Sequence, residues 1–133
     1  MSPSVKVGDK IELVTAPITT RQLVQYAGAS GDFNRIHYDE PFARAAGFET
    51  VIAHGMLSMA FFGQLVADVA GPQHVRSLKA RFRAVTYPGD VIRVSGEVVE
   101  VSDTADGGKM YGIKLSAARP DGTIALEGHA ILS

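Results

Sequence analysis

Residues 53–70 read AHGMLSMAFFGQLVADVA, and this stretch decides the fold. From Met56 on, polar side chains interrupt it only at Ser58, Gln64 and Asp68, so a helix here is apolar on almost every side. Such a helix has to be buried over most of its surface. Gly71 and Pro72 follow, and this dipeptide favours the end of a helix because proline cannot continue it. We therefore predict one long central helix.

Beyond this stretch the apolar pattern changes to a period of two, which is typical of strands that bury one face. Residues 78–84 show it first, since apolar side chains alternate there with Lys79, Arg81 and Arg83. Turn-forming residues then separate three further predicted strands, over residues 91–101, 109–118 and 123–132. We expect the four strands to follow one another as hairpins and therefore to be antiparallel.

One strand and two short helices are predicted before the central helix. The strand covers about residues 11–14. Thr19 or Thr20 is suited to cap a helix that runs to about Ala29. An acidic pair followed by proline opens a second helix over residues 39–46, because these residues are favoured in a first helical turn.

These elements together predict one α+β domain over residues 1–133. An antiparallel sheet of about five strands must bury one face, and the long apolar helix is suited to its concave side. A helix wrapped by such a sheet is the hot-dog fold. The length agrees, because 133 residues suffice for one domain with a sizeable core.

Composition excludes several classes of function. Lys and Arg number 13 and Asp and Glu 14, so the formal net charge of −1 predicts no binding to nucleic acid or to a membrane surface. The chain has no cysteine, which excludes disulfides, thiol nucleophiles and thiolate metal sites. Its first residues lack the apolar core of a signal peptide, and no segment is apolar enough to span a bilayer. We expect a cytoplasmic protein.

The loop that reads SGDFNRIH, from Ser30 to His37, has the composition of an acid/base site. Gly31, Asp32 and Asn34 all disfavour regular structure. A carboxylate five positions before an imidazole can exchange protons with it near neutral pH. A polar turn that contains a hydrogen-bonded histidine is the alternative.

The start of the central helix is unusual. No Ser, Thr, Asp or Asn stands at the expected cap position before Gly55, so the first backbone N–H groups lack an obvious partner. Glycine leaves room for a close approach, and such a helix start can receive an anion or a developing oxyanion. Water, or a side chain from another segment, could complete the cap instead.

Together, the loop and the helix start resemble the MaoC-like or hydratase-2 family of hot-dog enzymes. The resemblance is carried by Gly31-Asp32-x-Asn34-x-Ile36-His37 and by Ala53-His54-Gly55-Met56. It is densest over residues 26–63, and weaker framing segments extend it over nearly the whole chain. It implies reversible hydration of trans-2-enoyl thioesters of CoA or acyl carrier protein to (R)-3-hydroxyacyl thioesters, with no cofactor.

The resemblance also implies a role for each matching residue. Asp32 and His37 would be the catalytic pair, holding one water and exchanging protons with the substrate. Asn34 would orient that water, and the backbone N–H of Gly55 would bind the thioester oxygen. Neighbouring residues are predicted to contact the substrate, namely Ser30, Gly31, His54 and Met56.

Other polar residues are less informative. Arg35 departs from the family pattern, which usually has proline there. It could stabilise the charged form of Asp32, contact a phosphate of the thioester carrier, or simply be solvated. The basic face of residues 79–83 could likewise receive CoA or an acidic carrier protein, or remain solvated. His74 and His129 are expected to be structural, and no metal site is predicted.

Pairing of subunits is expected, because a single copy exposes an edge strand and a half-built acyl tunnel. The resemblance implies a dimer with its sheets side by side. This is expected to be a homodimer, or a heterodimer with a related hot-dog subunit as in dehydratases whose catalytic subunit this chain resembles. Two alternative functions remain, a non-catalytic acyl-thioester-binding subunit and a hot-dog thioesterase.

Overall fold

The predicted central helix is α3, Gly55–Ala70, in the computed structural model, which describes residues 5–133. Most of its large apolar side chains are buried, and those of Phe62 and Val66 are completely inaccessible to solvent, whereas Met56 is exposed. Among residues 5–133, no helix combines the length and the apolarity that a membrane crossing needs. The predicted lack of a signal-peptide core rests partly on residues 1–4, which lie outside the described residues.

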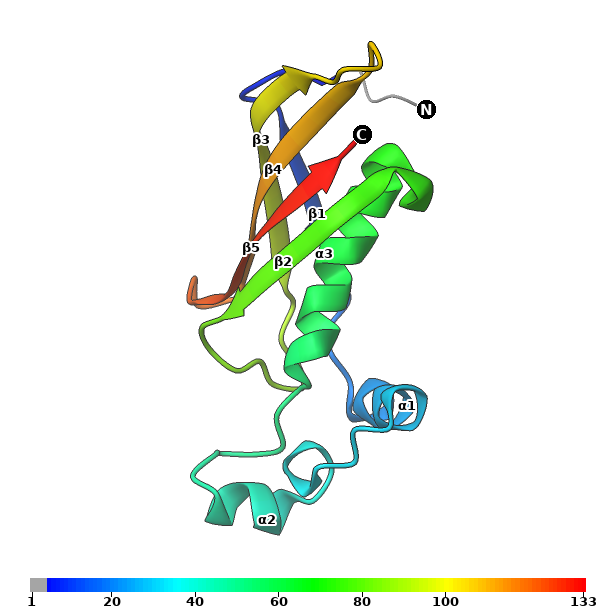
Figure 1. The fold of residues 1–133 in the computed structure, drawn as a ribbon. Helices are drawn as coiled ribbons and strands as arrows, with labels where there is room; N and C mark the ends of the chain where they lie inside the picture. The colour runs from blue at the N-terminus through cyan, green and yellow to red at the C-terminus, as the bar shows by residue number, and fades with distance from the viewer. Residues whose placement is uncertain (1–4) are drawn as a thin grey trace.

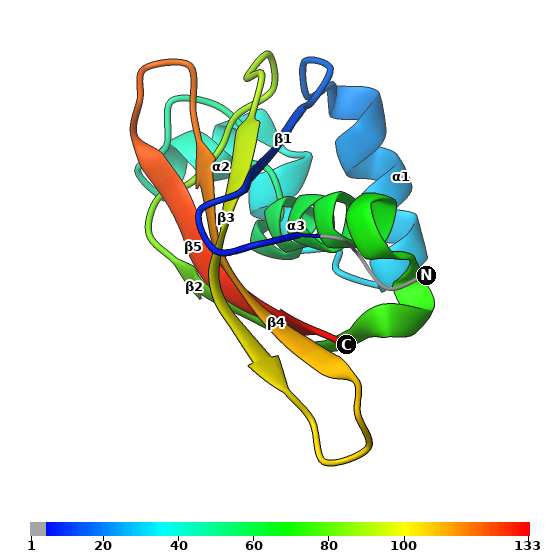
Figure 2. The ribbon, with the colours of Figure 1, turned by 90° about the horizontal axis from the view of Figure 1, so that it is seen from above.

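Five strands form one antiparallel sheet in the order β1-β3-β4-β5-β2. They are β1 (Lys10–Val14), β2 (Val75–Phe82), β3 (Arg93–Asp103), β4 (Lys109–Ala118) and β5 (Ile124–Leu132). The sheet curves around α3, which packs along one of its faces (Figures 1 and 2). This arrangement confirms the predicted α+β hot-dog fold with about five strands.

One predicted strand pairing is wrong. β2 does not form a hairpin with β3 but pairs with β5 at the other edge of the sheet, where Leu78 lies opposite Ala130. Residues 83–92 therefore cross from one side of the sheet to the other. The predicted turn exists, because Asp90 N–H donates to Tyr87 O at 3.1 Å. Its backbone is held by Ile18, whose carbonyl accepts from the N–H of Gly89, so the turn anchors a crossing rather than closing a hairpin.

The bounds of β2 also differ from the prediction of residues 78–84. The strand begins at Val75, directly after the short helix η2 (Pro72–His74), and ends at Phe82. Leu78 and Ala80 pack against the core as the period of two predicts. Phe82, however, is 52% exposed, although its ring lies beside Gly55 at the start of α3.

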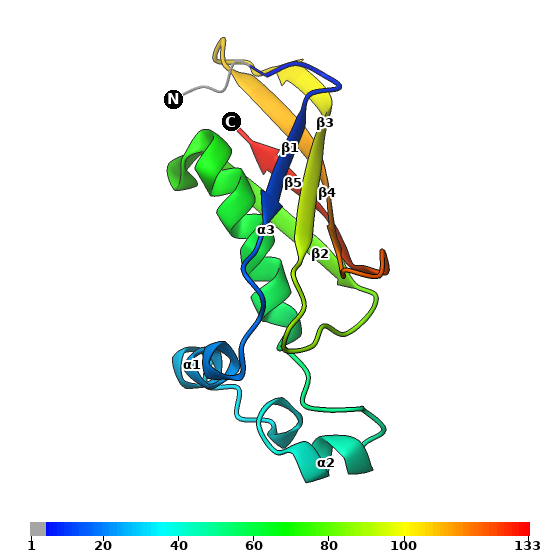
Figure 3. The ribbon, with the colours of Figure 1, turned by 180° about the vertical axis from the view of Figure 1, so that it is seen from behind.

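The predicted early helices gather at the end of the molecule where α3 begins (Figure 3). They are α1 (Thr20–Ser30) and α2 (Glu40–Ala45), and the loop between them also contains a short helix that was not predicted, η1 (Arg35–His37). Thr19 caps α1 by accepting a hydrogen bond from Gln22 N–H at 3.0 Å, which confirms the predicted start. The loop between α1 and η1 is thereby placed beside the first turn of α3.

Candidate active site

The loop after α1 takes its shape from its small and polar residues. Gly31 ends the helix in the left-handed region, at φ 75°, and its N–H donates to Ala27 O at 2.9 Å. Ser30 Oγ accepts from Asp32 N–H at 3.2 Å. Ser30 and Gly31, predicted as substrate contacts, thus contribute here to the turn that presents Asp32.

Asn34 connects the loop to η1. Its side-chain oxygen accepts from Ile36 N–H at 3.2 Å and so caps the short helix. Its own backbone N–H lies 3.3 Å from Asp32 Oδ1, which fixes one carboxylate oxygen. The other carboxylate oxygen of Asp32 remains available to a second partner.

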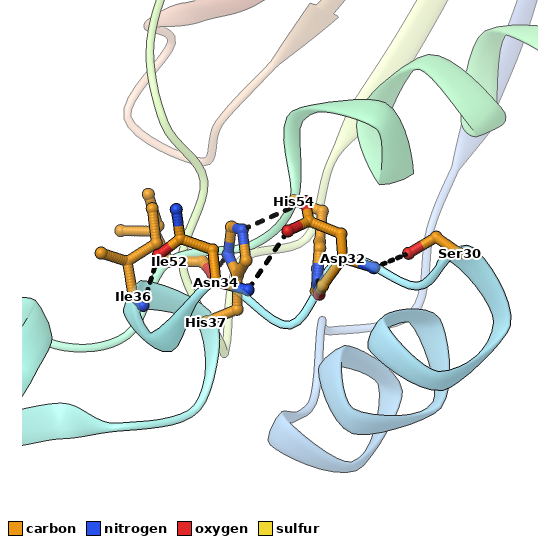
Figure 4. A network of polar contacts seen from close by, with 7 residues as sticks. All are labelled: Ser30, Asp32, Asn34, Ile36, His37, Ile52 and His54. Atoms are coloured by element: carbon orange, nitrogen blue, oxygen red, sulfur yellow. Dashed lines mark hydrogen bonds and ion pairs between the residues drawn. The ribbon is translucent and has the colours of Figure 1, made fainter.

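That partner is His37, as Figure 4 shows. Its Nε2 lies 3.6 Å from Asp32 Oδ2, with His37 buried and the Asp32 side chain 51% exposed. His37 Nδ1 lies 2.7 Å from the carbonyl oxygen of Ile52. A carbonyl can only accept, so Nδ1 carries the proton, and Nε2 is the nitrogen left to exchange protons beside the carboxylate.

Residues 51–54, just before α3, bind the loop to the rest of the molecule through their main chain. Ile52 N–H donates to Ile36 O at 3.0 Å, and Ala53 N–H donates to Thr86 O at 2.8 Å. These bonds join the Asp32 loop, the start of α3 and the connection between β2 and β3. The position of His37 is thus set mainly by backbone hydrogen bonds.

His54, the residue before α3, lies behind the pair rather than on an open surface. It is 1% exposed, its ring stacks on His37 at 3.7 Å between centroids, and its Nε2 lies 3.1 Å from Asp32 O. Burial lowers the pKa of His54 below its usual value, against a smaller opposite effect of the Asp32 hydrogen bond. His54 is therefore favoured as a neutral ring.

A cavity of about 380 Å³ lies on the other side of His37. Both His37 and Gly55 line it, whereas Asp32 is outside the lining and lies next to His37. Most of its other lining residues are apolar, including Ile36, Ile52, Ala53, Ala84, Val85 and Ala125. An apolar pocket with a few convergent polar groups is the usual form of a small-molecule site.

The start of α3 meets this cavity at Gly55. No side chain in the described part of the chain caps the helix, as predicted. A Cβ added to Gly55 would lie 3.0 Å from Phe82 Cε1, so glycine is the residue that leaves the first turn accessible here. Met56, another predicted substrate contact, is 55% exposed and lies outside the cavity lining.

Sequence reasoning missed three contributors to the site. The Ile52 carbonyl fixes the tautomer of His37, but a backbone group has no sequence signal. Phe82 packs on Gly55 only because the end of β2 lies beside α3. Ser58 is buried and lines the cavity one helical turn after Gly55. Its hydroxyl interrupts the apolar stretch, and that interruption was the available signal.

Arg35 pairs with Asp39 rather than with Asp32. Its Nη2 lies 2.8 Å from Asp39 Oδ2, and its guanidinium lies 4.4 Å from the centre of the Phe42 ring. This hydrogen bond holds the pKa of Asp39 below its usual value. Asp39 also caps α2, so Arg35 supports the element next to the loop.

Some of the remaining polar residues make structural contacts, and others are exposed on the surface. His74 Nδ1 lies 2.6 Å from Ser133 O, consistent with its expected structural role. Lys79 and Arg81 are exposed, whereas Arg83 pairs with Glu127 at 3.0 Å and lines the cavity. The predicted basic face is therefore only partly free to receive a carrier.

Asp32, His37 and His54 also lie close enough together to suggest a metal site, with ligand atoms within 4.8 Å of one another. Their orientation argues against one. The two imidazole rings are stacked with 21° between their planes, and a ring nitrogen binds a metal along its own plane. Their free lone pairs therefore run side by side instead of converging on one ion.

The chain belongs to the family described as the MaoC like domain, whose model matches residues 4–117. It is 34% identical to the mitochondrial 3-hydroxyacyl-(acyl-carrier-protein) dehydratase of Arabidopsis thaliana over 74% of this chain and 59% of that protein. The R-hydratase PhaJ1 of Pseudomonas aeruginosa has a similar structure, with a TM-score of 0.86 and 30% identity over 98% of this chain and 83% of that one. A chain of the ChsH1–ChsH2 complex of Mycobacterium tuberculosis also has a similar structure. Its TM-score is 0.84, and it is 25% identical over 97% of this chain and 98% of that one.

Proposed function

We propose that the chain catalyses the reversible addition of water to trans-2-enoyl thioesters, giving (R)-3-hydroxyacyl thioesters. The observation that carries the proposal is the 3.6 Å approach of His37 Nε2 to Asp32 Oδ2 beside the apolar cavity. A hydratase and a dehydratase among the similar proteins support the same reaction class.

In this mechanism Asp32 and His37 hold the attacking water between them. As its oxygen bonds to C3 of the substrate, one O–H bond breaks and that proton passes to the pair. The pair returns one proton to C2, so one water is added and nothing is oxidised or reduced. Because Nδ1 of His37 is committed to Ile52 O, the exchange on the imidazole takes place at Nε2.

Gly55 acts at the other end of the reacting group. As the C2 carbanion forms, negative charge moves onto the thioester oxygen. Gly55 lines the cavity, and no side chain of residues 5–133 caps the start of α3, so Gly55 N–H is proposed to donate to that oxygen. A fixed donor of this kind contributes roughly 3 kcal/mol to the transition state in comparable sites.

A hydration assay tests the proposal, with crotonyl-CoA as substrate and loss of the conjugated enoyl absorbance as the signal. Asp32→Asn and His37→Ala should each lower kcat by about 100-fold or more, because each removes one proton-exchanging group. Asp68→Asn and His129→Ala are matched controls away from the cavity lining and should keep the wild-type rate. Wild-type rates in either site variant contradict the mechanism.

The same assay separates the alternatives. Release of free CoA with the enoyl group intact indicates a thioesterase. Binding without turnover, alone or with a related subunit, indicates an acyl-thioester-binding chain. Chiral analysis of the 3-hydroxyacyl product tests the R configuration, and parallel reactions with an acyl-carrier-protein substrate identify the carrier.

We also propose that the chain works as a dimer built through the free edge of β2. This strand pairs with β5 on one side only, and Phe82 at its end is half-exposed beside the cavity. An unpaired edge next to an apolar side chain favours pairing with another sheet. The expected partner is a second copy, with a related hot-dog subunit as the alternative.

A further inference from the structure

His54 is the most completely buried polar side chain of the site, and its contacts are unusual. Its ring stacks on His37 and meets the ring of Tyr26 at 4.8 Å on a 55° tilt. Its Nε2 faces the backbone carbonyl of Asp32 at 3.1 Å. One imidazole thus touches the side chain of one member of the proposed pair and the main chain of the other (Figure 4).

The hydrogen bonds assign opposite tautomers to the two stacked rings. His54 must carry its proton on Nε2, because the Asp32 carbonyl can only accept. His37 must carry its proton on Nδ1, because the Ile52 carbonyl can only accept. His37 therefore presents an unprotonated Nε2 to Asp32 Oδ2. His54, stacked on it, instead has the proton on Nε2 and none on Nδ1.

The second nitrogen of His54 has no hydrogen-bond partner within residues 5–133, and it is buried. A proton added there would become a buried N–H without an acceptor, which is strongly disfavoured. Burial also lowers the pKa of His54, which likewise favours the neutral ring. His54 thus remains a neutral ring with one fixed donor while its neighbour exchanges protons.

We propose that His54 is a positioning residue that fixes the backbone of Asp32 and supports the ring plane of His37, and that it does not contact the substrate. This inference rests on the proposed hydratase function. It replaces the predicted substrate contact, and it accounts for an imidazole that is 1% exposed and lies outside the cavity lining.

Two substitutions separate the parts of this role. His54→Phe keeps a flat ring against His37 but removes the donor to Asp32 O. His54→Gln keeps a donor at about the reach of Nε2 but removes the ring. We expect His54→Phe to lower kcat by roughly 10- to 100-fold with KM within about twofold, since misplacing a reacting group by about 1 Å has effects of this size. His54→Gln should recover a substantial part of kcat.

Nitrogen-15 NMR of substrate-free protein gives a readout that does not depend on activity. The wild type should show His37 as the Nδ1–H tautomer and His54 as the neutral Nε2–H tautomer. In His54→Phe the tautomer of His37 should stay the same, because Ile52 O still fixes it, whereas the amide resonances next to Asp32 should shift because Asp32 O has lost its donor. If the wild type shows these tautomers but has no hydratase activity, the proposed function fails and the positioning contacts stand.

Two results overturn the inference. One is a His54→Phe or His54→Gln enzyme with a raised KM and an unchanged kcat, which indicates a substrate contact. The other is a wild-type His54 protonated on Nδ1. If His54→Phe does not fold, the wild-type tautomers together with the kinetics of His54→Gln decide the matter.

Discussion

Gly55 provides the sharpest test at the scale of a single residue. In Gly55→Ala the added Cβ lies 3.0 Å from Phe82 Cε1, at the mouth of the cavity where the thioester oxygen is expected to bind. Crowding this donor should lower kcat/KM by about tenfold or more. The fold should tolerate the change, because the Phe82 ring is half-exposed and can move away from the added methyl group. Hydration kinetics and thermal unfolding measure the two effects.

Gly28→Ala is the matched control for this substitution. Gly28 lies within α1, and a Cβ added to it meets no atom within 4 Å. It should leave the activity unchanged and can slightly raise the stability. Wild-type activity in Gly55→Ala would show that Gly55 N–H does not bind the substrate oxygen.

At the scale of an element, α1 depends on the cap at Thr19. Thr19→Ala removes the acceptor for Gln22 N–H and should lower the free energy of unfolding by about 1 kcal/mol. Thr19→Ser keeps the hydroxyl and should stay close to the wild type. Urea denaturation followed by circular dichroism measures both. Equal losses in the two variants would indicate that the methyl group, rather than the cap, stabilises the helix.

Elements with a strong local signal were predictable from the sequence. The apolar stretch specified α3, and the period of two specified β4 with its observed bounds, Lys109–Ala118. The pairing of β2 with β5 was not predictable, because a turn signal at residues 87–90 marks a change of direction but not which strands become neighbours. That choice depends on packing against α3 and Ile18.

The candidate active site, too, was predictable from the sequence only in part. The family motif identified Asp32 and His37, and the structure places their side chains 3.6 Å apart. Their assigned roles, and that of Asn34, remain predictions. The place of His54 was not predictable, since burial behind His37 depends on residues far apart in the sequence.

At the scale of the whole molecule, stability should depend on the charge state of His54. Its pKa is lowered by folding, so the unfolded chain binds its proton more readily, and stability is lost as pH falls through the unfolded value of 6.5. One proton accounts for at most about 1.4 kcal/mol per pH unit. Urea midpoints measured between pH 7.5 and 5.5 should therefore fall more steeply in the wild type than in His54→Phe. Parallel slopes would show that His54 titrates alike in the folded and unfolded chains.

The proposed dimer is a second prediction at this scale. The native mass should be twice the chain mass of 14.1 kDa, and Phe82→Asp should reduce it by placing a charge beside the free edge of β2. Val7→Asp is the control, since Val7 is 61% exposed and lies away from that edge. Size-exclusion chromatography with light scattering measures all three proteins. A monomeric wild type contradicts the dimer of two copies.

The backbone bonds among the loop, residues 51–54 and Thr86 have a consequence for how such a site can diverge. Because main-chain atoms hold much of the geometry, side chains that project outward can be exchanged without displacing the reacting groups. Phe33 lies in the loop and Tyr38 directly after it, and both are more than half-exposed. Both lie outside the cavity lining, so Phe33→Ala and Tyr38→Ala should keep a hydration rate close to that of the wild type.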